Sequence, residues 1–199
     1  MNAATRLVHG HREQSGYVIY NELDLYPALL ALFAIGISAL AARRVTPLSR
    51  VLTAVDVPDP NGRQPFAVRV SSWRVLNGQV CNELLGKEIS RRTPISDYLA
   101  ARLREPVGHV LSSDDEYDDS FDQLEYLLGV VSVFAYGRGP IGRFVWRHQR
   151  YGLDGLPENV LSDHEQALLD AGLFDGDPDL LAEAKATYDS RVQQSGLGF

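Results

Sequence analysis

Cysteine and histidine are both scarce in this chain. The single cysteine, Cys81, excludes an intramolecular disulfide and a cysteine-based zinc site. His9 and His11 are the closest histidine pair, but Glu13 is the only carboxylate near them. His164-Glu165 lacks the second histidine of a zinc-protease helix, and no G-x-S-x-G elbow occurs. We therefore expect neither a metal nor a cofactor, while an enzyme assembled from distant residues stays open.

Lysine is scarce as well, since seventeen arginines accompany two lysines. With the many alanines, this bias indicates a bacterial genome of high GC content. The first sixteen residues lack the apolar core of a signal peptide. We expect a mobile N-terminus over 1–16 and a location in a reducing cytoplasm.

The longest stretch without charge, 25–42, is at the lower limit of length for a membrane span. Six alanines, a glycine, a serine and a proline make it only modestly hydrophobic. Leucine, isoleucine and phenylalanine recur in it at helical spacing, beside a stripe of small residues. The pattern favours a buried central helix, with membrane association as the alternative.

Helix caps and breakers divide the rest of the chain. Thr46-Pro47, Thr93-Pro94 and Asp177-Pro178 each predict a helix start. Ser120 with Gln123, and Ser162 with Glu165, form candidate capping boxes, and Gly137 and Gly172 are candidate helix ends. Apolar residues surround nearly the whole circumference of 124–136, which is typical of a bundle core.

We therefore predict an all-α fold, an irregular bundle of about six to eight helices around the apolar helix 124–136. A chain of 199 residues with 45% apolar content can build one sizeable core, so we expect a single domain over 17–194. The breakers within 56–64 mark a candidate sub-boundary, and 195–199 form a tail that frays. The stretch 66–85 fits either helix or strand, and its apolar stripe favours helix.

Charge is sharply segregated. Seven acidic residues and no basic one lie between Ser113 and Tyr136, whereas Gly137 to Tyr151 holds four arginines and no carboxylate. Such segregation either pairs within the fold or faces a partner. The net charge of −7 repels nucleic acid from most of the surface, so we expect no nucleic-acid partner apart from a local arginine patch.

The acidic residues from Asp114 to Glu125 have an alternative interpretation as a calcium-binding loop. Oxygen-bearing side chains occupy loop positions 1, 3, 5, 9 and 12 if counting starts at Asp114. However, Asp119 stands where the sharp turn requires glycine, and Pro106 to Gly108 would break the entering helix. The sequence therefore favours a solvated acidic loop over a calcium site.

The arginine-rich segment is the best candidate site, because arginines interleave with aromatic residues as they do in interaction hot spots. Its glycines do not form a phosphate-binding P-loop, since GK[ST] is missing. The candidate interaction surface is Arg138, Arg143, Trp146, Arg147 and Arg150. Its acidic counterpart is Asp114, Asp115, Glu116, Asp118, Asp119 and Asp122. An internal clasp between the two sets and an intermolecular surface both remain open.

No motif assigns an activity. We expect a non-enzymatic protein-interaction or regulatory helical module of a bacterial multi-component system, with a protein partner or self-association. The alternatives are an enzyme with a spatially assembled site and a protein that associates with the membrane through 25–42. No membrane partner is favoured, and a small-molecule ligand cannot be read from the sequence.

Overall fold

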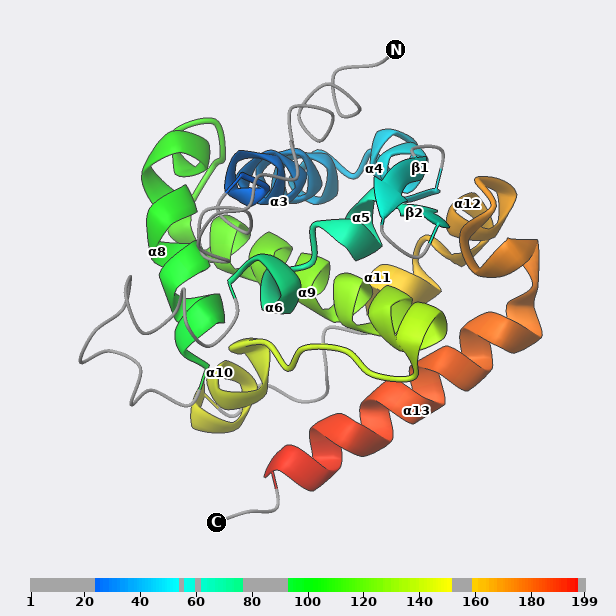
Figure 1. Ribbon diagram of the computed structural model, residues 1–199. Coiled ribbons are helices and arrows are strands. Elements are labelled where there is room, and N and C mark those ends of the chain that lie inside the picture. Colours follow the sequence, from blue (N-terminus) through cyan, green and yellow to red (C-terminus); the bar gives the residue numbers. More distant parts are fainter. Residues whose placement is uncertain (1–23, 54–55, 60–61, 77–92, 152–158, 197–199) are drawn as a thin grey trace.

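A 23-residue helix, α9 (Asp114–Tyr136), crosses the middle of the molecule, and the other helices pack around it (Figure 1). The computed structural model describes residues 24–53, 56–59, 62–76, 93–151 and 159–196. Within these ranges, the helices of eight residues or more are α3 (Tyr26–Ala41), α4 (Val45–Thr53), α8 (Pro94–Gly108), α9, α10 (Phe144–Tyr151) and α13 (Pro178–Gly196). The predicted all-α bundle around a buried apolar helix is confirmed.

Helix α9 begins earlier than the sequence predicted. Ser113 is its N-cap, and the hydroxyl accepts a hydrogen bond from Glu116 N at 3.1 Å. The acidic run is therefore helix and not a loop, and the capping box expected at Ser120 is wrong. Three carboxylates in the first turn face the positive end of the helix dipole, which favours this earlier start. As predicted, Gly137 ends the helix in the left-handed region with φ 68°.

Burial along α9 follows its apolar sequence. Every side chain from Leu124 to Val133 is buried, whereas Phe134 is 39% exposed in the last turn. Helix α3 packs along α9, and its Gly36 lies directly against Leu124 because a hydrogen in place of a side chain allows close approach. Apolar side chains of α3, among them Leu29, Leu32 and Ile37, are fully buried. The predicted central position of 25–42 is therefore confirmed.

No helix in the described ranges combines the length and the apolar character that crossing a bilayer requires.

Helix α13 packs on α9 from the C-terminal side of the chain. Asp177 caps it as predicted, since its Oδ1 accepts a hydrogen bond from Asp179 N at 2.8 Å. The side chains expected to face inward are buried, namely Leu181, Ala184, Tyr188 and Val192. Helix α13 extends through Gly196, so the first two residues of the expected tail are helical. Residues 197–199 and the expected mobile segment 1–16 lie outside the described ranges.

The breaker region forms the only strands in the described ranges, an antiparallel pair β1 (Asp56–Asp59) and β2 (Gly62–Pro65). Two four-residue helices follow, α5 (Phe66–Arg69) and α6 (Ser72–Val75). The favoured helical state is therefore confirmed for 66–69 and 72–75, although Val70 and Ser71 divide it into two short helices. The remainder of the ambiguous segment, 77–92, is outside the described residues.

Two further boundary predictions are wrong. Pro106 does not break its helix, because α8 continues through it to Gly108. The capping box at Ser162 is absent, since that serine ends α11 (Asn159–Ser162) and α12 (Glu165–Asp170) starts after His164 without a side-chain cap.

Gly172 does end this region in the left-handed conformation with φ 87°, and a 3-10 helix, η2 (Leu173–Gly176), follows. Thr46-Pro47 lies within the first turn of α4, which begins one residue earlier.

The same substitution, isoleucine to alanine, at two positions of α3 tests this packing. Ile37 is 0% exposed and Ile35 is 43% exposed. We expect Ile37→Ala to lower the free energy of unfolding by about 2–5 kcal/mol, since it removes buried contacts and leaves a cavity. Ile35→Ala should cost about 1 kcal/mol or less, because water already reaches that side chain. Denaturant unfolding measures both values, and equal costs would show that α3 is not packed as described.

Candidate functional site

The acidic and arginine-rich segments meet inside the fold. Asp118 and Asp122 lie one turn apart on α9, and Arg143 and Arg147 lie one turn apart at the start of α10. Arg143 Nη2 contacts Asp118 Oδ1 at 2.6 Å, and Arg143 Nε lies 3.3 Å from Asp122 Oδ1. Arg147 pairs with Asp122 through Nη1. We call Asp118, Asp122, Glu125, Arg143 and Arg147 the charge cluster, and these contacts form an internal clasp.

Helix α8 extends the clasp toward solvent. Arg104 contacts Asp118 Oδ1 at 2.5 Å and the exposed Asp114 at 2.9 Å. The other predicted acidic residues do not join it. Asp115 and Asp119 are exposed, and Glu116 accepts a hydrogen bond from Ser112 N at 2.6 Å. The acidic segment therefore has an inner face bound to arginine and an outer face in water.

Glu125 lies at the buried end of the charge cluster. Ser96 Oγ, in the first turn of α8, donates to Glu125 Oε2 at 2.6 Å. The backbone N–H of Arg143 donates both to Ser96 Oγ at 2.9 Å and to Glu125 Oε2 at 3.2 Å. Burial raises the pKa of Glu125 from its usual 4.5 to about 8, and Asp122 nearby adds to the shift. Glu125 is therefore mostly protonated at neutral pH.

The arginines have the opposite effect on Asp118. Burial opposes its ionisation, but Arg143, Arg147 and Arg104 together hold the pKa of this carboxyl below its usual value. Burial likewise favours neutral Arg143, and Asp122 and Asp118 outweigh it, so the pKa of that guanidinium is raised. With Glu125 protonated, Asp118 and Asp122 balance Arg143 and Arg147. Neutrality permits these groups to remain buried together.

The calcium alternative is wrong in its premise. Residues 114–125 are helical, so the side chain at its position 3 points away from those at positions 1 and 5, and the three cannot wrap one ion. Within the described residues, no group of three or more histidine, cysteine or acidic side chains is arranged to hold a metal ion.

Two glycines of the segment 137–142, which we call the strap, allow close packing. A side chain at Gly139 would collide with the backbone oxygen of Gly129 on α9, and one at Gly142 would collide with the Glu125 carboxylate. The segment therefore lies flat on α9, and Tyr188 of α13 fixes it by donating to Pro140 O at 2.6 Å. This strap brings Arg143 back to the acidic face of α9.

Arg138, at the start of the strap, faces solvent and belongs to a different group. Its guanidinium lies 5.2 Å from the centre of the Trp73 ring, and Trp73 meets Tyr136 edge-on at 6.0 Å. Arg74 lies over the Tyr136 ring at 5.4 Å and donates to its hydroxyl at 2.5 Å. We call Trp73, Arg74, Tyr136 and Arg138 the cation–aromatic cluster. Among the described residues, no acceptor lies within hydrogen-bond distance of the buried Trp73 Nε1.

The structure thus divides the predicted interaction surface. Arg143 and Arg147 bind inward, Arg138 faces outward, and Trp146 is half-buried on α10. The side chain of Arg150 is outside the described residues. Trp73, Arg74 and Tyr136 were not predicted as site residues, since they join Arg138 only through the fold. The adjacent Trp-Arg pair was the only local signal.

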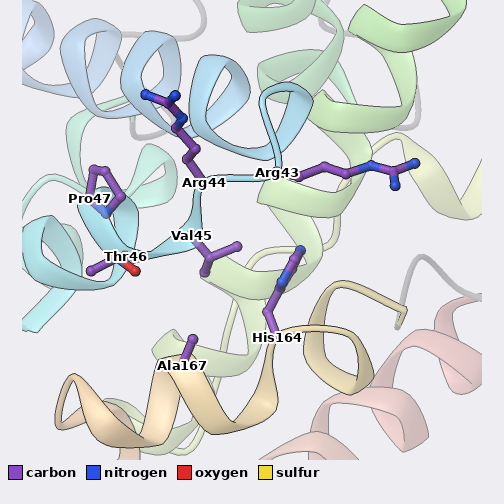
Figure 2. Close-up of a pocket in the computed structure, with 7 residues that line it drawn as sticks. All are labelled: Arg43, Arg44, Val45, Thr46, Pro47, His164 and Ala167. Atoms are coloured by element: carbon purple, nitrogen blue, oxygen red, sulfur yellow. The ribbon is translucent and has the colours of Figure 1, made fainter.

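A separate pocket of about 390 Å³ lies between α12 and the α3–α4 connection (Figure 2). Arg43, Arg44 and His164 contribute to its lining, and it shares no residue with either cluster. The two arginines leave the connection in opposite directions in Figure 2, so their guanidinium groups do not converge on one ligand position. Exposed Asp163 and Glu165 flank His164 in sequence and oppose anion binding there.

Removing one member of the clasp should be costly. Asp122 is 1% exposed, so Arg143→Met would remove one of the two arginines that pair with this buried carboxylate. We expect a loss of about 3–5 kcal/mol in the free energy of unfolding. The double variant Arg143→Met/Asp122→Leu should lose clearly less than the sum of the two single variants. Arg191→Met, at an exposed arginine of α13, is the matched control. Additive costs would contradict the clasp.

Glu125 makes stability depend on pH. Its folded pKa of about 8 lies above its usual 4.5, so folding takes up a proton between these values. The stabilisation is complete below pH 4.5 and is lost as pH rises through about 8. We expect the melting temperature of the wild type to fall between about pH 5 and 8 more steeply than that of Glu125→Gln, whose side chain stays neutral. Parallel pH profiles would contradict the assignment.

Comparisons of the chain with protein-family models, with curated proteins and with solved structures gave no match.

Proposed function

We propose that this protein is a non-enzymatic interaction module that binds an acidic partner through the cation–aromatic cluster. We place it in the bacterial cytoplasm, as one component of a larger assembly, with self-association among its interactions. The arginine and alanine bias and the single cysteine support this setting.

The exposed guanidinium of Arg138 is the observation that carries the proposal. Within the described part of the chain, its interaction is with the Trp73 ring, and no carboxylate pairs with it. Arg143 and Arg147, in contrast, are engaged by Asp118 and Asp122. Arg138 therefore retains its full capacity to bind a carboxylate.

The cluster has the composition and geometry of an interaction hot spot. Tryptophan, tyrosine and arginine dominate such sites, because they bury a large rigid area and also offer polar groups. The ring of Trp73 holds the Arg138 guanidinium in place through a cation–π contact, so less side-chain entropy is lost on binding. A planar guanidinium recognises carboxylate oxygens in bidentate fashion, which favours an acidic protein partner.

The charge cluster supports the enzyme alternative less well. Its raised Glu125 pKa is a feature of many catalytic acids. However, Ser96, the Arg143 backbone and the strap enclose this carboxylate, and the pocket in Figure 2 lies against other residues. The ion pairs of the charge cluster hold α8, α9 and α10 together, and this structural role accounts for them without a catalytic one.

Charge reversal at Arg138 tests the proposal. We expect Arg138→Glu to weaken association by about 2 kcal/mol or more, about thirtyfold in the dissociation constant, and the wild-type affinity to fall with ionic strength. Sedimentation velocity measures self-association, and affinity capture from the source cells measures other partners. Thermal melting should be unchanged, because Arg138 is exposed.

Arg191→Glu is the matched control, since it reverses an exposed arginine elsewhere on the molecule, on α13. It should leave association intact. Equal association of the wild type and Arg138→Glu would contradict the proposed surface, and so would a wild type that neither self-associates nor retains a partner.

A further inference from the structure

We infer that the acidic partner is a second copy of this chain, whose α12–α13 edge docks on the cation–aromatic cluster. This inference rests on the proposed function and names the occupant of the same surface. The edge consists of five exposed carboxylates, which are Asp170, Asp175, Asp177, Asp179 and Glu183. We call these five residues the acidic edge.

The acidic edge carries charge of one sign only. Between Asn159 and Ala184 the sequence contains neither lysine nor arginine. Asp170 accepts a hydrogen bond from Gln166 and Asp177 caps α13, but both donors are neutral. Within the described residues, no ion pair neutralises any of the five carboxylates. The edge therefore presents an uncompensated negative potential to solvent.

Within the described residues, no carboxylate of the acidic edge pairs with Arg138 of the same molecule. Figure 1 shows α12 and the beginning of α13 along one edge of the molecule, away from α6, which carries Trp73. Arg138 stacks on that tryptophan. Complementary charge on separate surfaces of one chain can be satisfied between copies. Like charges on the acidic edges of two copies would repel, which favours cluster-to-edge contact over edge-to-edge contact.

A contact between two different surfaces is heterologous. Each copy that binds through its cluster still presents a free acidic edge, so association continues head to tail until a ring closes or a filament grows. A twofold dimer, in contrast, would use one surface twice and stop at two copies. The stoichiometry of association therefore distinguishes the two arrangements.

Complementary variants provide the test. Arg138→Glu removes the cluster, and Asp179→Lys/Glu183→Lys reverses two carboxylates one turn apart on α13. Asp115→Lys/Asp119→Lys is the matched control, because it also reverses two exposed carboxylates one turn apart near a helix start. Asp177 is left unchanged, since it caps α13. Each protein is studied over a concentration series by sedimentation velocity and light scattering.

We expect the wild type and the control variant to form oligomers larger than dimers. The cluster variant and the edge variant should each stay monomeric alone. An equimolar mixture of these two should form a dimer and stop there, since one intact cluster meets one intact edge.

Two outcomes would overturn the inference and leave the proposed function standing. In the first, the edge variant associates like the wild type while the cluster variant does not. In the second, the mixture stays monomeric although another acidic protein binds the intact cluster. Unchanged association of the cluster variant would overturn both the inference and the proposed function.

Discussion

The ion pair between Arg143 and the buried face of α9 is the contact on which the rest of the structure depends. Asp122 is almost completely withdrawn from water, so α9 can lie at the centre only if a cation is brought to it. The strap over Gly129 delivers that cation, and Ser96 ties α8 to the same point. The need to place a cation beside the buried Asp122 carboxylate therefore fixes the positions of α8, α9 and α10.

The same requirement explains why neighbouring arginines have different roles. Arg143 and Arg147 meet α9 because the strap ends beside its acidic face, and their charge is used within the fold. Arg138 precedes the close contacts of the strap and remains at the surface. Its ring partner, Trp73, reaches it from α6, more than sixty residues earlier in the sequence. Arg143 and Arg147 are largely withdrawn from water and need the carboxylates of α9, whereas the exposed Arg138 does not and is the arginine proposed for binding.

Local sequence patterns predicted helix ends correctly where the chemistry of a single residue determines the backbone conformation. Gly137 and Gly172 adopt the left-handed region, and Asp177 caps α13, as expected from their own chemistry. The pattern failed at Ser120 and Pro106, where both residues lie inside helices. Ser113 offered an earlier cap, and the acidic run that resembled a loop gains from the helix dipole once it is helical.

The sequence by itself determined the all-α class, the burial of 124–133 and the segregation of charge, because periodicity, caps and net charge are properties of neighbouring residues. Only the tertiary structure decided that Arg143 and Arg147 bind inward and that Trp73 and Tyr136 surround Arg138. These contacts join residues far apart in the chain. The free-energy cost of burying a charge and the gain from pairing it both depend on which residues the fold brings together, so the sequence alone does not give them.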